Sequence, residues 1–324
     1  MYMLKYICKR IGLMVMTFSI IFVMCFVLIR LLPQEFQVNF GEDANKLKNL
    51  WIERGYDKPI IEQLFTYLKR VFVDGDFGIS FNLADHRYDP VWDIFTSKLP
   101  PTILINIYSS LLAVPIGIAL GIFAALKKNK WQDHVISTAV MVVISVPSFV
   151  YGSLLLYIIC FKLGWFPKTM LSLNAAGGTY FSWAMFKSML PAVFALSFGS
   201  IAGYARYTRA ELTEVLTSEF MLLARTKGLT KSQATVRHAL RNAMVPIFPS
   251  IIGEFIGVLS GSLVIEKIFG IPGVGGLYLS AINAMDYDVF MMLSGFYILV
   301  GLVAGLVIDL SYGIIDPRIR MGAR

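Results

Sequence analysis

Residues 11–32 read IGLMVMTFSIIFVMCFVLIRLL, and this run decides the class of the fold. Its single charged residue is Arg30, close to the end of the run. A bilayer core of ~30 Å is crossed by ~20 consecutive apolar residues in a helix. Since every backbone polar group in lipid must be satisfied internally, a run of this length predicts a membrane-spanning helix.

Five more apolar runs follow along the chain, whose 324 residues are 56% hydrophobic and only 15% charged. Soluble domains are ~45–50% apolar and ~25% charged, so both percentages indicate a membrane protein. The sequence therefore predicts an all-α polytopic membrane protein with six transmembrane helices. The expected spans are 11–32, 101–126, 135–161, 189–206, 245–268 and 289–312.

Basic residues before the first span could also indicate a signal peptide. However, the apolar run is longer than a signal-peptide core and no small-residue cleavage pattern follows it, so we expect a retained helix. If the N-terminus is cytoplasmic, the segments on the same side of the membrane also carry many basic residues. Cytoplasmic segments are enriched in Lys and Arg, so this pattern predicts that both termini are cytoplasmic. These residues are Lys5, Lys9, Arg10, Lys127, Lys128, Lys130, Arg209, Arg225, Lys227, Lys231, Arg237, Arg241, Arg318, Arg320 and Arg324.

The spans divide the chain into three expected parts. Residues 1–98 hold the first helix and a polar extracytoplasmic insert, in which 59–73 have helical apolar spacing. Residues 99–312 form the transmembrane core with a cytoplasmic loop at 207–244, and 313–324 form a cytoplasmic tail. The insert is either a folded cap on the helices or a docking surface for a protein that delivers substrate.

Small residues and prolines within the spans predict how the helices pack. GxxxG spacing lets helix backbones approach closely in lipid, and it indicates a bundle or a dimer without distinguishing them. Pro115 and Pro147 are expected to kink the second and third spans. The GxxxG pairs are Gly117/Gly121, Gly253/Gly257, Gly257/Gly261 and Gly301/Gly305.

The sequence lacks the motifs that several functional classes require. The three cysteines and three histidines are scattered without CxxC or HExxH spacing, so we expect neither a metal site nor a cofactor. The net charge of +8 is concentrated beside membrane spans, which argues against nucleic acid as a partner. No GxxxxGK[ST] motif occurs, so we do not expect the chain to bind ATP through a P-loop.

The loop at 207–244 has the pattern of two helices joined by a tight corner. Apolar residues recur at helical spacing from Glu211 onward, and Gly228 suits the left-handed residue that ends a helix. Thr230 or Ser232 can cap a second helix through Ala243. On these grounds the loop is either a protruding helix–turn–helix or an amphipathic hairpin held on the membrane surface.

The residues around this corner resemble a known family. EFMLLARTKGL at 219–229 and RHALRNA at 237–243 are similar to the EAA loop of ABC importer membrane subunits, in the oligopeptide, dipeptide and nickel permease branch. SVPSF at 145–149 and LGWFP at 163–167 agree with that branch. The further matching segments are DKP at 57–59, GDFGIS at 75–80, GIPGVG at 270–275 and DPRIR at 316–320.

The resemblance covers nearly the whole chain and departs at two places. The family usually has PGDP after the first span where this chain has PQEF at 33–36, and Leu223 replaces the first alanine of a small pair. Both departures could tune contacts with the solute receptor or the ATPase.

The resemblance implies the type I ABC importer permease fold and a transport subunit without catalysis of its own. Its implied partners are a second homologous permease subunit, two ABC ATPase subunits and an extracytoplasmic substrate-binding protein, in the cytoplasmic membrane of a bacterium. Its implied cargo is an oligopeptide or dipeptide, with nickel or another small solute as the alternative. The implied ATPase-coupling residues are Glu219, Leu223, Ala224, Arg225, Lys227, Gly228, Arg237 and Arg241.

Glu254 is the acidic residue that lies deepest within an expected span. Such residues are costly in lipid and face a cavity or a partner. We hypothesise that Glu254 lines the translocation path and contacts a peptide amine or a cation; the alternative is an interhelical hydrogen bond. A secondary carrier would need ion-coupled charged relays in the helices, and one deep acid makes that class a weaker alternative.

Overall fold

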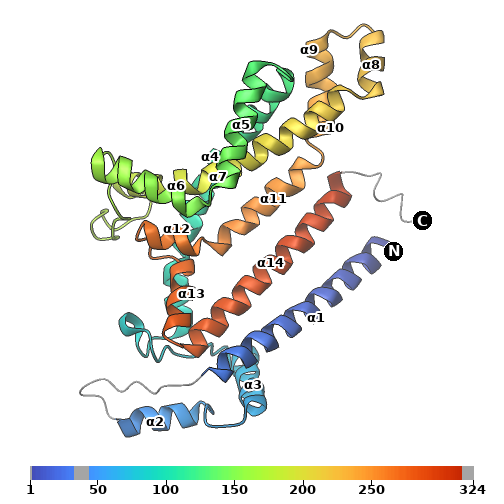
Figure 1. The fold of residues 1–324 in the computed structure, drawn as a ribbon. Helices are drawn as coiled ribbons and strands as arrows, with labels where there is room; N and C mark the ends of the chain where they lie inside the picture. Colours follow the sequence, from blue (N-terminus) through green and yellow to red (C-terminus); the bar gives the residue numbers. More distant parts are fainter. Residues whose placement is uncertain (1, 33–43, 316–324) are drawn as a thin grey trace. The chain divides into compact units, whose positions relative to one another are not determined.

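The computed structural model describes residues 2–32 and 44–315. The PQEF segment and the DPRIR motif of the tail lie outside the described residues. The described chain consists of helices joined by loops (Figure 1). Its α-helices are α1 (Tyr2–Leu31), α2 (Ala44–Glu53), α3 (Ile60–Lys69), α4 (Val91–Leu126), α5 (Trp131–Ser145), α6 (Ser148–Leu155), α7 (Trp183–Leu216), α8 (Glu219–Thr226), α9 (Lys231–Ala234), α10 (Leu240–Ala243), α11 (Ile247–Gly257), α12 (Leu263–Ile268), α13 (Val274–Asn283) and α14 (Tyr287–Ile315).

The predicted polytopic membrane fold is confirmed. Four helices, α1, α4, α7 and α14, are long and apolar enough to cross a membrane. Two further pairs of helical segments, 131–162 and 231–260, qualify as one bent span each, which gives up to six spans within the described residues.

The third span is not the single helix that was expected at 135–161. The chain bends by 98° between Ser145 and Ser148, where Val146 is extended and Pro147 follows. Proline disfavours helical geometry in the preceding residue and lacks the N–H that would continue the helix. The predicted kink at Pro147 is therefore a sharp turn, whereas Pro115 lies within the continuous helix α4.

The fourth and fifth spans also differ from their expected limits. α7 continues to Leu216, so the first part of the expected loop belongs to this long helix. The fifth span ends at Gly261, whose φ of +65° is left-handed, and α12 starts afresh after it. A side chain at Gly261 would meet the buried Glu266 carboxylate, to which Thr102 Oγ1 donates a hydrogen bond of 2.8 Å.

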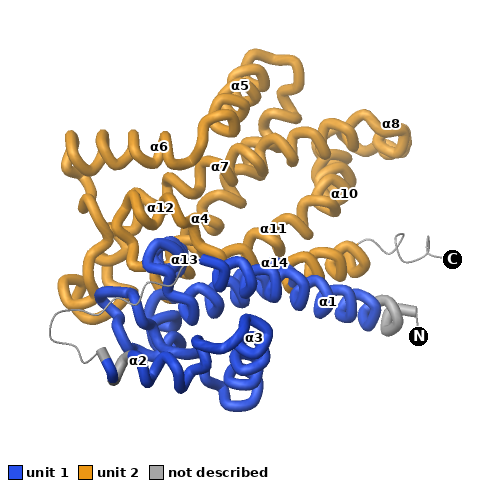
Figure 2. Tube along the Cα trace, turned by 60° about the horizontal axis from the view of Figure 1, so that its bottom comes forward, with its two compact units in different colours: residues 1–99, 274–302 blue, residues 100–273, 303–324 orange. Residues whose placement is uncertain are grey.

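The chain divides into two compact units, coloured in Figure 2. Unit 1 comprises 1–99 and 274–302, and unit 2 comprises 100–273 and 303–324. Unit 1 has one core between α4, α13 and α14 and another between α1, α3 and the start of α14. The largest core of unit 2 joins α4, α7 and α12.

The GxxxG motif of α4 allows the close packing that was predicted. A Cβ added at Gly117 would lie 2.6 Å from Tyr204 Cβ, and one at Gly121 would lie 2.6 Å from Thr208 Cβ, both on α7. The two backbones therefore approach closely because these residues are glycines. Added Cβ atoms at Gly301 and Gly305 meet nothing within 4 Å.

Candidate functional site

The loop after α7 folds into a two-helix corner, which lies beyond the end of α7 in unit 2 (Figure 1). α7 and α8 are separated by a short break at Thr217 and Ser218. Gly228 has φ +88°, and its N–H donates to the Arg225 carbonyl at 3.0 Å. The Leu229 N–H donates to the Ala224 carbonyl at 3.4 Å. These two bonds complete a Schellman motif, so Gly228 ends α8 as its sequence predicts.

The second arm of the corner begins with a complete capping box. The Gln233 N–H donates to Thr230 Oγ1 at 3.3 Å, while the Thr230 N–H donates to Gln233 Oε1 at 3.1 Å. Thr230 is therefore the cap, in preference to Ser232. α9, a π-helical turn at Thr235–Ala239 and α10 then follow without a break. Hydrogen bonds therefore define both the end of α8 and the start of the second arm.

Small and aliphatic side chains fill the inside of the corner. Ala224 is 9% exposed and packs with Leu212 of α7 and with alanines of the second arm. Ala224 therefore packs inside the corner, where its methyl group lies between the two arms. The other buried members of this cluster are Ala125, Met221, Ala234, Ala239 and Ala243.

The outer face of the corner combines apolar and charged side chains. Leu222, Leu223 and Val236 are 66%, 56% and 61% exposed, respectively. Gly228 is also exposed, and an added Cβ there would meet nothing within 4 Å. Among the exposed residues of the corner, we call the following set its outer face: Glu219, Phe220, Leu222, Leu223, Arg225, Lys227, Gly228, Val236, Arg237 and Arg241. Seven of the eight residues proposed for coupling are exposed, and the eighth, Ala224, is buried.

Glu254 lies where α11 faces a polar cavity of about 270 Å³ in unit 2. Ser200 Oγ on α7 donates a hydrogen bond of 2.8 Å to Glu254 Oε1. The structure thus shows the interhelical hydrogen bond of one interpretation together with the cavity that the other requires. The remaining lining residues are Asn106, Ser109, Ser110, Leu196, Gly253, Gly257 and Val258.

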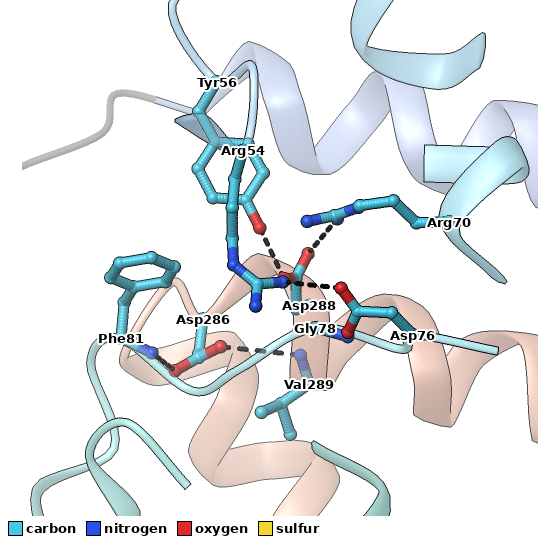
Figure 3. Close-up of polar contacts among 9 residues, drawn as sticks. All are labelled: Arg54, Tyr56, Arg70, Asp76, Gly78, Phe81, Asp286, Asp288 and Val289. Atoms are coloured by element: carbon cyan, nitrogen blue, oxygen red, sulfur yellow. Dashed lines mark hydrogen bonds and ion pairs between the residues drawn. The ribbon is translucent and has the colours of Figure 1, made fainter. Parts of the chain in front are cut away.

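Two buried aspartates at the start of α14 were not predicted from the sequence. Asp286 caps this helix, since the Val289 N–H donates to Asp286 Oδ1 at 3.4 Å. Its other oxygen accepts from the Phe81 N–H at 2.8 Å (Figure 3). The same oxygen accepts from Ser80 Oγ at 2.7 Å. Burial raises the pKa of the Asp286 carboxyl despite these donors. The aspartate thus ties the GDFGIS loop to the helix.

Asp288 is the centre of a charged cluster within unit 1 (Figure 3). Its side chain is fully buried, and it accepts a hydrogen bond from the Tyr56 hydroxyl and one of 3.5 Å from Arg70. Burial and the Asp288 charge raise the pKa of Tyr56 well above its usual range, which keeps the phenol protonated as a donor. Gly78, at φ +99°, passes so close to Asp288 that a side chain would collide with the carboxylate.

These aspartates have partners that lie more than 200 residues away in sequence. An acidic residue before an apolar run is a usable signal for a helix cap at Asp286. Nothing local to Asp288 indicates the arginine and tyrosine that surround it. No group of three or more His, Cys, Asp or Glu side chains that could hold a metal ion occurs among the described residues.

Comparison with known proteins places these features in a family. A family model described as "Binding-protein-dependent transport system inner membrane component" matches residues 117–321. A second model, for the N-terminal part of such membrane components, matches residues 3–106. Together they cover nearly all of the chain, including the corner and Glu254.

Three relatives are similar over their full length. The chain is 34% identical to the dipeptide transport system permease protein of Lactococcus lactis, over 98% of this chain and 100% of that one. It is 35% identical to the oligopeptide transport system permease protein of Salmonella typhimurium, with the same coverage. It is 33% identical to the glutathione transport system permease protein of Escherichia coli, over 98% and 99%. The chain therefore belongs to the family of binding-protein-dependent transport system inner membrane components, and it is a permease subunit of an ABC importer.

Proposed function

We propose that this chain carries dipeptides or oligopeptides across the cytoplasmic membrane. The proposal rests on full-length similarity to permeases named for these cargoes, while another relative is named for glutathione, itself a small peptide. Within the structure, the observation that supports such a cargo is the cavity beside Glu254. Serine, asparagine and carboxylate groups line it, and these suit the amides and the ammonium group of a peptide.

The outer face of the corner is the proposed seat for an ATPase subunit. Its leucines offer apolar contact area, and Arg225, Lys227 and Arg237 offer charge that fixes the orientation of the partner. A capped corner moves as one piece. Its buried residues pack against Leu212 of α7, so a push on the corner is transmitted to that helix. Closure of the ATPase then opens the membrane subunits toward the outside.

The complete assembly contains this chain, a homologous second permease subunit, two ATPase subunits and a substrate-binding protein. Permease subunits of this family work with an ATPase and a substrate-binding protein; the subunit numbers and the peptide cargo are part of the proposal. ATP hydrolysis belongs to the ATPase subunits. Both termini and the corner lie in the cytoplasm, while the insert at 33–100 faces the outside.

Uptake into proteoliposomes built from the four kinds of subunit tests this function. With the cognate binding protein, we expect ATP-dependent accumulation of labelled di- or tripeptides that vanadate abolishes and an ionophore leaves unchanged. A binding protein that captures nickel complexes and no peptide would overturn the cargo assignment. Uptake that follows an ion gradient and ignores vanadate would overturn the ATP-driven mechanism.

A further inference from the structure

The helix α3 has two apolar faces, and only one of them is covered within unit 1. Ile60, Leu64 and Tyr67 pack into the core that α3 shares with α1. Ile61 and Phe65 point away from this core and are 70% and 66% exposed. One helical turn separates these two residues, so they lie on the same face.

The π-helical turn that follows α3, Arg70–Asp74, extends the uncovered apolar surface. Phe72 and Val73 on this turn are 74% and 73% exposed. We call Ile61, Phe65, Phe72 and Val73 the outer apolar face of α3. The exposed charged residues Glu62 and Lys69 lie along one side of it. Large aromatic side chains rarely gather on a surface that faces only water.

The depth of α3 along α1 identifies what covers this face. The Tyr67 ring lies 6.1 Å from the ring of Phe22 and 5.8 Å from that of Phe26, both on α1. The membrane-spanning part of α1, Ile7–Leu31, is 25 residues long. At ~1.5 Å per residue it measures ~37 Å, and Phe22 lies ~14 Å before its end.

This geometry sets Tyr67 of α3 at the level of the outer part of the hydrocarbon core. The core is ~30 Å thick, so the span exceeds it by ~7 Å. Even if all of this excess lies at the C-terminal end of α1, the level of Phe22 is still inside the hydrocarbon, and that of Phe26, ~7 Å before the end of the span, is at its edge. Leu28 and Met24 of α1 are themselves 61% and 56% exposed, which is expected for a lipid-facing surface.

We infer that the outer apolar face of α3 is a lipid-binding surface that embeds the helix in the membrane leaflet at the C-terminal end of α1. The charged residues Glu62 and Lys69 lie on the side of α3 that faces the headgroups and water. The polar insert is thus held at two places, by the Asp288 cluster within the protein and by the outer face of α3 in lipid.

Spin-label accessibility in the assembled transporter, reconstituted in lipid nanodiscs, tests this inference. Single cysteines replace Phe65, Phe72 and, as a matched control on the same helix, Glu62, in a background without Cys8, Cys25 and Cys160. Leu28→Cys on α1 is the lipid reference. Each label is measured for collision with oxygen, which concentrates in lipid, and with a water-soluble nickel complex.

Labels at Phe65→Cys and Phe72→Cys are expected to collide with oxygen several-fold more than with the nickel complex, as at Leu28→Cys. The label at Glu62→Cys is expected to show the reverse preference. Nickel accessibility at Phe65 and Phe72 equal to that at Glu62 would overturn the inference in favour of a face open to water. Low accessibility to both reagents would overturn it in favour of a protein partner on this face. Peptide uptake by the same variants checks the proposed function separately.

Discussion

At the scale of single residues, Gly228 controls the corner through its backbone conformation. Its φ is +88° and an added side chain would meet no neighbour, so a substitution changes the backbone energy and creates no collision. A left-handed conformation costs an ordinary residue ~1–2 kcal/mol, most for β-branched residues and least for asparagine.

We expect Gly228→Val to weaken the corner and uncouple transport, while Gly228→Asn stays close to wild type. A loss of 1–2 kcal/mol shifts a local equilibrium by roughly 5–30-fold. The ratio of peptide uptake to ATP hydrolysis measures coupling, and the amount of chain in the membrane measures insertion, which both variants should retain. Full coupling in the valine variant would contradict the role of this residue.

Glu254 is the charged residue among those that line the cavity. If it attracts the ammonium group of a peptide, Glu254→Gln should raise the KM for cationic peptides by several-fold and leave N-acetylated peptides nearly unaffected, because the amide keeps the shape and loses the charge. Ser109→Ala, elsewhere on the lining, is the control that alters polarity without charge. If Glu254→Gln matched wild type in its kinetics for every class of peptide, the path hypothesis would fail. The role of Glu254 would then be its hydrogen bond to Ser200.

At the scale of elements, the approach of α4 to α7 depends on two glycines. In Gly121→Leu the new side chain would collide with Thr208 Cβ and with the Ala205 carbonyl oxygen, which lies 2.7 Å from the added Cβ. The second of these is a backbone atom, so α7 itself would have to shift. Overpacking of this kind costs roughly 1–3 kcal/mol. We expect a clearly lower unfolding temperature in detergent, whereas Gly305→Leu, at an open position, should match wild type. Equal stability of both variants would contradict the packing of α4 on α7.

The sequence predicts where the membrane spans lie better than it predicts where they bend. Hydropathy reports that 135–161 is apolar, and it does not distinguish a straight helix from the 98° bend at Pro147. The corner is predicted closely because Gly228 and Thr230 act through neighbours in sequence. The burial of Ala224 was not predicted, because its packing partners on α7 and α9 meet it only in the fold. The Asp288 cluster was not predicted for the same reason.

For the whole molecule, the proposed orientation places both termini and the corner on the cytoplasmic side of the membrane. Membrane-impermeant thiol reagents should label a single cysteine placed at Asp57 in the insert from outside intact cells, and should label Lys227→Cys only after the membrane is opened. Labelling of Lys227→Cys in intact cells would reverse the topology and remove the corner from the side where ATP is found.

In the proposed mechanism, the outer face of the corner is the contact through which ATP drives transport. A photo-crosslinking amino acid at Leu223 tests it most directly, with the same amino acid at the exposed Leu154 of α6 as control. In membranes that contain the whole transporter, we predict an adduct between position 223 and the ATPase subunit, and none from position 154. Adducts of position 223 with lipid alone would contradict this contact, because the corner would then be a hairpin lying on the membrane surface.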